Sequence, residues 1–284
     1  MHQFTLSHLL AVLLSLRFEV AFVLGALLLE LWIRGEPSRF RRPSFLTDLL
    51  YCAFYRLGVF TLLFDTPIRH ILRDQLHLQL LPAAPLWVRV GAYLLILDLT
   101  NYWIHRWQHS SAFLWAFHRV HHSQTQLTAL ATYRTHPVDA WLRSVIGPAI
   151  FMLLLGIPPA VWFPLAIGWD IVLNLSHMEV DWGFRPLHWL VVSPRFHSLH
   201  HSIVEKDQQY NFSMTLSIWD YLFGTARMPD GRPAQVGLSD WESGESIGAQ
   251  LFSPVRFLAA ARRARTESTE PAPEAVVPPV RQVR

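Results

Sequence analysis

The stretches HRVHH, residues 118–122, and HSLHH, residues 197–201, each place three histidines at relative positions one, four and five. In an α-helix of 3.6 residues per turn, offsets of three and four return to the same face, so each stretch predicts a helix face that carries three imidazoles. A third stretch, HRWQH at residues 105–109, adds two histidines four positions apart. We expect the fold to bring these segments together. They supply eight histidines, which are His105, His109, His118, His121, His122, His197, His200 and His201.

These histidines are candidate metal ligands. Neutral imidazole is a common ligand of transition metals, and helical spacings of three or four let two side chains share one ion. A tetrahedral zinc ion would use four ligands at most, so eight converging histidines predict two metal ions. His177, in NLSHMEVDW at the end of a long apolar stretch, would emerge at the same surface and is a predicted ninth ligand.

Other residues are candidates for an additional ligand or for orienting the ligands. His136, in RTHPVD, precedes a proline, and a ligand and a structural turn residue are equally good interpretations of it. Asp98 lies two turns before His105 in an apolar segment, where a carboxylate is expected to be functional, for example by fixing a histidine tautomer. Candidates for the same task, with solvated loop positions as the alternative, are Asp139, Glu179 and Asp181.

The composition favours a membrane protein. Of the 284 residues, 51% are hydrophobic and only 16% are charged, a balance short of charge for a soluble enzyme of this size. The apolar segments 9–33, 45–64 and 86–104 are each about long enough to span a bilayer as a helix, and 45–64, which carries Asp48 and Arg56, could instead lie in the membrane interface. A fourth, 146–175, is broken by Pro158 and Pro159 and predicts two packed or re-entrant helices. We therefore expect an all-α integral membrane bundle of about four or five membrane helices.

Charge predicts the orientation of this bundle. Basic residues favour the cytoplasmic side, and residues 34–44 contain four arginines whereas residues 1–8 contain no basic residue. The first helix should therefore end in the cytoplasm, and the histidine stretches should lie in a helical cap on that side. The net charge of +3 comes from scattered residues, which argues against a nucleic-acid partner.

The domain organisation is simple. Residues 1–265 are expected to form one membrane-embedded domain with its motif core at 90–225. Residues 266–284, TESTEPAPEAVVPPVRQVR, are rich in proline and poor in aromatic residues, so we expect a disordered tail.

The ordered motifs DLTNYWIHRWQH, HRVHHS, RTHP, SPRFHSLHH and WDYLFGT resemble the fatty acid hydroxylase and sterol desaturase superfamily of membrane di-iron enzymes. The resemblance covers about residues 90–225. It implies a non-haem centre of two iron ions that activates O₂ and attacks an unactivated C–H bond of a lipid. Carried across motif by motif, it implies nine ligands, which are His105, His109, His118, His121, His122, His177, His197, His200 and His201.

Two positions depart from the pattern of the superfamily. Some members have a further histidine four residues after the one that matches His177. Here that residue is Asp181, which leaves one coordination position open to His136 or water. Members often carry Asn-x-Gly after the last HxxHH, whereas this chain has Asn211, Phe212 and Ser213, so the asparagine matches and the glycine does not.

The resemblance implies an oxidoreductase that hydroxylates or desaturates a lipid of the sterol, fatty acyl, alkyl ether or carotenoid class. Electrons would come from a separate ferredoxin or b-type cytochrome, since the chain shows no cofactor-binding signature of its own. Iron is implied only by the resemblance, because imidazole also suits zinc and copper, and zinc is possible in the purified protein. The alternative is a zinc-dependent membrane hydrolase, which lacks an HExxH helix here. Eight clustered histidines are too many for a third interpretation, a bis-histidine haem carrier.

Overall fold

The protein is described by a computed structural model that covers residues 6–67, 80–144 and 155–267. Over these ranges the regular elements are helices, and the sheet-like pairing is limited to one isolated antiparallel bridge between Ser202 and Val236. The predicted all-α class is therefore confirmed for the described part of the chain.

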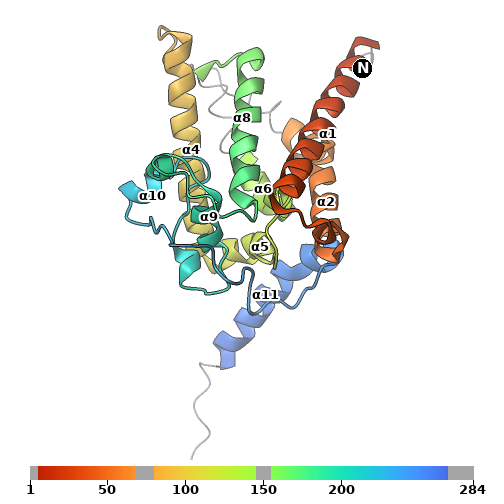
Figure 1. The fold of residues 1–284 in the computed structure, drawn as a ribbon, viewed down its shortest axis with the longest axis vertical. Helices are drawn as coiled ribbons and strands as arrows, with labels where there is room; N and C mark the ends of the chain where they lie inside the picture. The colour runs from red at the N-terminus through yellow and green to blue at the C-terminus, as the bar shows by residue number, and fades with distance from the viewer. Residues whose placement is uncertain (1–5, 68–79, 145–154, 268–284) are drawn as a thin grey trace, which may run out of the picture.

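Four long helices form the upper part of the molecule in Figure 1. They are α1 (Leu6–Arg34), α2 (Pro43–Arg56), α4 (Leu86–Ser110) and α8 (Pro159–His177). Gly58 follows the end of α2 with a φ of +81°, a conformation that glycine adopts readily, and a π-helix at Thr61–Asp65 comes next. The predicted break in the fourth apolar segment is present, because α8 begins at Pro159, but residues 145–154 of that region lie outside the described residues.

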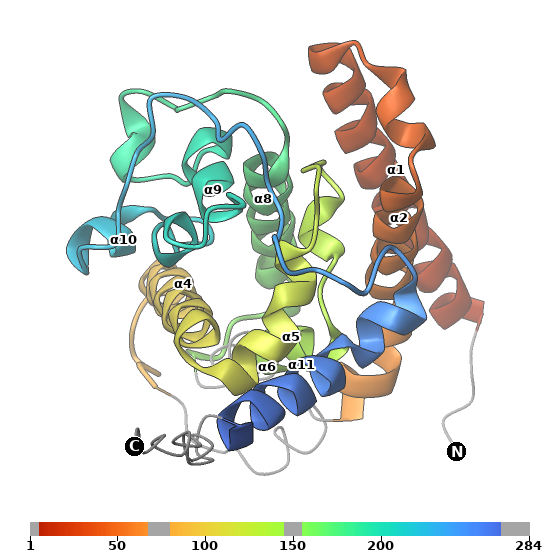
Figure 2. The ribbon, with the colours of Figure 1, turned by 90° about the horizontal axis from the view of Figure 1, so that it is seen from below.

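The remaining α-helices make a lower layer, seen from below in Figure 2. They are α5 (Ala112–His122), α6 (Pro137–Ser144), α9 (Pro194–His200), α10 (Ile218–Leu222) and α11 (Ile247–Glu267), with 3₁₀ turns at Pro37–Arg41, Ala131–Tyr133, Leu187–Trp189 and Asp207–Gln209. Helix α5 packs against both α4 and α11, and α9 packs against the end of α8. The sequence analysis did not anticipate α11, which includes Thr266 and Glu267 of the predicted tail; the rest of that tail lies outside the described residues.

Buried ion pairs hold the two layers together. The fully buried Arg134, in the loop after α5, donates to Asp48 of α2 at 2.5 Å and to Glu245 before α11 at 2.8 Å. Arg39, after α1, donates to Glu179, just beyond α8. These contacts fix the lower layer against the ends of the long helices.

Among the described helices, none combines the length and the apolar character that crossing a bilayer requires.

Candidate metal centre

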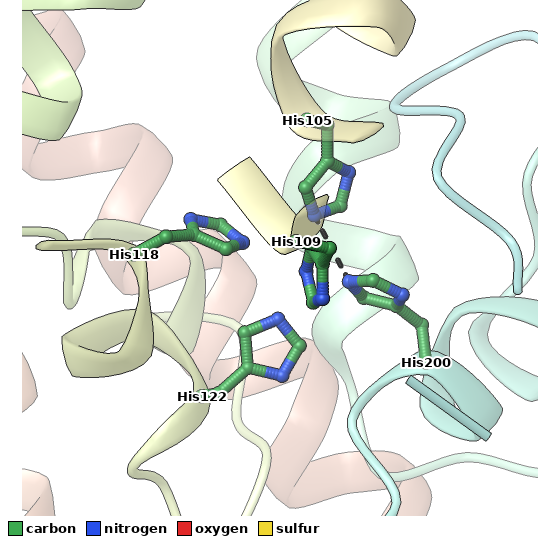
Figure 3. Close-up of side chains that lie close together, drawn as sticks. All are labelled: His105, His109, His118, His122 and His200. Carbon is green, nitrogen blue, oxygen red and sulfur yellow. Dashed lines mark hydrogen bonds between the residues drawn. The ribbon is translucent and has the colours of Figure 1, made fainter. Parts of the chain in front are cut away.

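The nine predicted histidine ligands lie together in two groups. The five-histidine group contains His105, His109, His118, His122 and His200, and the four-histidine group contains His121, His177, His197 and His201. Within each group the nitrogen atoms that face one another all lie within 4.8 Å. Figure 3 shows the rings of the five-histidine group converging from α4, α5 and α9 on one point.

Each HxxHH stretch is divided between the two groups. In the first, His118 and His122 belong to the five-histidine group while His121 belongs to the other. In the second, His197 and His201 belong to the four-histidine group while His200 crosses to the five-histidine group. Residues four apart thus share a group, and the histidine between them faces the neighbouring one, a division that the spacing alone did not predict.

Local sequence signals place the two HxxHH stretches on helices. Ser111 precedes α5, and its side chain accepts a hydrogen bond from the Leu114 amide at 3.4 Å. Ser193 does the same for Phe196 of α9 at 3.2 Å, and Pro194 at the first helical position suits the helix start. His105 and His109 need no such signal, because α4 continues from its apolar segment through the third stretch.

Backbone carbonyl groups orient four of the rings. The Nδ1 atom of His105 lies 2.6 Å from the Phe212 oxygen, and that of His200 lies 2.8 Å from the Tyr210 oxygen. In the four-histidine group, His121 Nδ1 lies 3.2 Å from the Arg134 oxygen, and His177 Nδ1 lies 2.8 Å from the Leu173 oxygen. A carbonyl only accepts, so Nδ1 carries the proton in each ring and Nε2 has a free lone pair. A further hydrogen bond of this kind fixes the tautomer of metal-binding histidines.

Asn211 lies between the two carbonyl groups that orient His105 and His200. Its φ is +60°, a left-handed conformation that asparagine tolerates, so the turn forms without the family's glycine. The Asn211 side chain donates to the Phe196 oxygen at 2.7 Å and accepts from the Arg227 amide at 2.7 Å. Asn211 therefore shapes the loop whose carbonyl groups orient His105 and His200.

Two buried aspartates hold the same loop. Asp220, of the WDYLFGT motif, accepts from the Phe212 and Ser213 amides at 2.8 Å each. Asp98 accepts from Thr215 Oγ1 at 2.6 Å and also from the Leu216 amide and the Trp219 indole. The expectation that Asp98 would contact a histidine is thus not met, because its oxygens bind the segment that follows the loop.

Asp139 is the carboxylate that contacts a histidine. Its Oδ2 accepts from His118 Nδ1 at 2.9 Å, and its Oδ1 accepts from Gln108 and from Arg143. Burial acts to raise the pKa of Asp139, but the Arg143 guanidinium and His118 outweigh it and hold that pKa at about 2. Asp139 is therefore a carboxylate that accepts from the His118 ring.

All nine imidazoles are in the neutral form near pH 7. Burial is the main cause, and it lowers the pKa of His177 to about 4 and that of His200 to about 3. Burial and the neighbouring histidines lower the pKa of His122 and His201, and likewise that of His105, His109, His121 and His197. Burial also lowers the pKa of His118, although Asp139 acts to raise it. Neutral imidazole is the form that binds metal ions.

The ring nitrogens that face one another show whether metal ions fit the two groups. His105 Nε2 lies 2.9 Å from His200 Nε2, and His121 Nε2 lies 3.2 Å from His177 Nε2. Because Nδ1 carries the proton in these rings, each contact brings two acceptors together, an arrangement that a cation between them would stabilise. Six further ring nitrogens are buried and make no hydrogen bond. They are His109 Nε2, His118 Nε2, both nitrogens of His122, His197 Nδ1 and His201 Nδ1. A buried polar atom without a partner is costly, so the residues present fit two imidazole-bound metal ions.

Two of the remaining candidates lie outside the groups. His136 has both ring nitrogens engaged, Nδ1 by the Val138 amide at 3.1 Å and Nε2 with the Leu251 oxygen at 3.2 Å. Asp181, at the position of the family's further histidine, forms an exposed ion pair with Arg195 at 2.7 Å. The structure therefore brings together nine of the candidate ligands and leaves these two away from them.

Two cavities have residues of the histidine-bearing helices in their walls. The first, of about 390 Å³, is mainly apolar and is lined by residues of α2, α4 and α8 that include Leu97, Trp169 and Leu173. It also reaches Asn101, one turn before His105 on α4. The second, of about 350 Å³, is more polar and includes His109 in its wall.

Sequence reasoning missed several supporting residues. Gln108 and Arg143 complete the contacts of Asp139, and Trp115 lies with its ring centroid 4.8 Å from that of His109. Gln108 sits inside the HRWQH stretch, so its place beside two candidate ligands was an available signal. The carbonyl groups carry no such signal, because every residue has one.

Comparison with known proteins identifies the motif core. The fatty acid hydroxylase family model matches residues 90–225. The ornithine lipid hydroxylase OlsE of Rhizobium tropici is 33% identical over 172 residues, which are 60% of this chain and 51% of the relative. Alkylglycerol monooxygenase of Danio rerio is 29% identical over 212 residues, 72% of this chain and 46% of the relative. Methylsterol monooxygenase 1-3 of Arabidopsis thaliana is 29% identical over 137 residues, 47% of this chain and 46% of the relative.

The chain spans about half the length of these curated relatives. No solved structure matches it.

Proposed function

We propose that the chain is a member of the fatty acid hydroxylase family, whose model matches residues 90–225, and that it is an O₂-dependent oxidoreductase that hydroxylates or desaturates a lipid. The observation that carries the proposal is the pair of buried histidine groups beside a mainly apolar cavity. The names of the three relatives agree in one respect, since each names a lipid that the protein hydroxylates or oxygenates.

We propose that each histidine group holds one iron ion. The five-histidine group would bind one ion through His105, His109, His118, His122 and His200, and the four-histidine group would bind the other through His121, His177, His197 and His201. When bound, two iron ions would supply the redox chemistry that activates O₂ for attack on a C–H bond. The donor set supports a transition metal, because it consists of neutral imidazoles and contains no carboxylate.

The chain itself positions the ligands and keeps water away. Asp139 and the carbonyls of Phe212, Tyr210, Arg134 and Leu173 fix which nitrogen of each ring faces the ion. Eight of the nine histidines are at most 3% exposed, and His109 is partly buried. A site closed in this way protects reactive species from bulk water and from side reactions.

The lipid would occupy the mainly apolar cavity. Its wall includes Leu173, whose carbonyl orients His177, and Asn101, one turn from His105. A volume of about 390 Å³ lies within the range of small-molecule sites. The cavity therefore suits the sterol, fatty acyl, alkyl ether or carotenoid part of a substrate.

We also propose that the upper helices are embedded in a membrane with the histidine layer on its cytoplasmic side. The support is the large apolar side chains that these helices expose, including Leu28 at 63%, Trp32 at 82% and Trp87 at 76%. The arginines of residues 34–44 follow the lower end of α1, in agreement with a cytoplasmic position of that end. A separate ferredoxin or b-type cytochrome would deliver the electrons.

The proposal is tested by metal analysis and lipid analysis together. Purified protein should contain about two iron ions per chain, and His121→Ala should lose metal together with O₂-dependent lipid turnover. Mass spectrometry of membrane lipids from cells with and without the gene identifies the substrate. Full turnover in His121→Ala, or hydrolysis under anaerobic conditions with zinc alone, would contradict the proposal and favour a zinc hydrolase.

A further inference from the structure

The apolar cavity carries a polar face on α8. Most of its wall is apolar, with Phe60, Leu97 and Trp169 among its residues. Asp170 and Asn174 of α8 line the same space, and they are four residues apart, so they lie on one side of that helix. Charged and amide groups are costly beside apolar ones unless they have a partner to bind.

Asn174 presents an acceptor without a protein partner. Its side chain is 3% exposed, and its Nδ2 donates to the Asp170 backbone oxygen at 2.7 Å and to the Tyr133 hydroxyl at 3.2 Å. A backbone oxygen only accepts, so the amide nitrogen must face it, which leaves Oδ1 on the other side. Oδ1 is buried and makes no hydrogen bond. The cavity wall therefore contains an amide oxygen that a ligand donor can satisfy.

An ion pair lies on the same face. Arg56 NH1 of α2 lies 2.5 Å from Asp170 Oδ2, with side-chain exposures of 18% and 26%. The other charged residue in the wall, Arg143, is bound to Asp139. The cavity thus presents one positive and one negative group side by side, with an acceptor one turn further along α8.

We propose that this polar face, Arg56, Asp170 and Asn174, binds the zwitterionic head group of an amphipathic lipid. The inference rests on the proposed function and names the class of its substrate. The cationic part of the head group would lie against Asp170 and Asn174, and the anionic part against Arg56. A head group of single charge would meet a like charge as well as its partner, and like charges brought together oppose binding.

The position of this face also predicts which carbons react. Helical rise places Asn174 about 4.5 Å and Asp170 about 10 Å from His177 along the axis of α8. A head group bound there would lie about 4.5–10 Å from His177 along the helix axis, a distance that only a few carbon–carbon bonds span. Oxidation should therefore occur in the head group or on the carbons nearest to it, rather than at the far end of the chain.

A competition experiment tests the head-group preference. Full-length, metal-loaded protein in detergent is mixed with equal concentrations of N-dodecylglycine, dodecanoate, dodecylamine and 1-O-dodecylglycerol, which share one alkyl chain, and the bound lipid is measured by native mass spectrometry. N-dodecylglycine should bind about tenfold better than either singly charged lipid. Equal binding of all four, or binding of the neutral diol as tight as that of the zwitterion, would overturn the proposal.

Charge variants make the test sharper. Arg56→Met removes the positive group and should shift the preference to dodecylamine, whereas Asp170→Asn removes the negative group and should shift it to dodecanoate. Asn174→Leu should weaken binding of N-dodecylglycine without favouring either singly charged lipid. The matched control is Arg227→Met, which breaks an exposed ion pair with Asp207 outside the cavity and should change nothing. An unchanged ranking in Arg56→Met and Asp170→Asn, with metal content intact, would overturn the proposal.

The two proposals fail differently. If the ranking is as expected but reduced donor, O₂ and lipid give no oxidised product, the polar face stands and the proposed function is wrong. If product forms from N-dodecylglycine with a deuterated chain, oxidation should lie next to the head group, and loss of deuterium from the chain end would contradict the binding position. The wild-type ranking alone decides the head-group question if a variant does not fold.

Discussion

The five-histidine group and the four-histidine group differ in their access to the surface. In the four-histidine group every ring is at most 3% exposed, and neither of the two described cavities includes one of these rings in its wall. In the five-histidine group His109 is only partly buried and lies in the wall of the second cavity, beside Trp115. The comparison teaches that two groups built from the same residue type, and sharing helices α5 and α9, can differ in how much of their edge faces a cavity.

The two groups also differ in redundancy. The five-histidine group has two pairs of residues four apart, His105 with His109 and His118 with His122, whereas the four-histidine group has one such pair, His197 with His201. Loss of one ligand therefore leaves four histidines in the first group and three in the second. The predictions below test this difference, from the largest expected effect to the smallest.

Removal of a ligand from the four-histidine group should have the largest effect. We expect His201→Ala to bind about one ion per chain and to lose activity, because three histidines remain for the second ion. His109→Ala should keep about two ions, because four histidines remain in its group. Metal content by mass spectrometry measures both, with His188→Ala, outside both groups, as the control. Equal metal loss in His201→Ala and His109→Ala would remove the distinction between the groups.

Asp139→Asn should lower the metal affinity of the five-histidine group but not that of the four-histidine group. The change weakens the hydrogen bond that orients His118, and we expect the metal affinity of the five-histidine group to fall by about 10–100-fold. It also leaves Arg143 without its carboxylate partner, which should lower the free energy of unfolding by about 3 kcal/mol. Metal titration and denaturant unfolding measure these effects. The control is Asp181→Asn at an exposed ion pair, and a similar loss there would show that the effect is not specific.

Asn211→Ala should have a smaller effect through the loop that orients His105 and His200. An alanine at a φ of +60° is strained, and the hydrogen bonds to Phe196 and Arg227 are lost, so we expect stability to fall by about 2–4 kcal/mol. Asn211→Gly keeps the backbone conformation accessible and should lose less. Thermal unfolding of both variants measures the difference, and an equal loss in the two would contradict the role of backbone strain.

Exchange of metal should show the smallest but most direct difference. Because His109 lies in the wall of a cavity, a chelator should remove the ion of the five-histidine group first, giving a time course with two phases. Ala112→Leu, which fills part of that cavity, should slow only the first phase. A single phase for both ions would show that the cavity does not control exchange.

The sequence predicted which histidines converge better than it predicted the residues that support them. The histidine stretches carry their own spacing signals, and α4 runs continuously from an apolar segment into HRWQH, so eight of the nine converging histidines could be named from local patterns, and His177 from its place at the end of an apolar segment and from the resemblance. The division of each HxxHH stretch between two groups depends on where α5, α8 and α9 meet, which no local pattern records. Asp98 was placed on the right helix but paired with the wrong partner, because its hydrogen bonds go to residues more than a hundred positions away. The orienting carbonyls and the polar face of the cavity depend on the same tertiary contacts.

The length of α9 has a consequence for how the protein survives in the cell. A helix of seven residues, Pro194–His200, is too short to persist alone in water, so its order depends on its packing against α8 and on the neighbours of its histidines. If the two histidine groups bind metal ions, we expect chains without metal to open this segment to proteases more often than chains with metal. Scarcity of the metal would then reduce the amount of the protein as well as its activity.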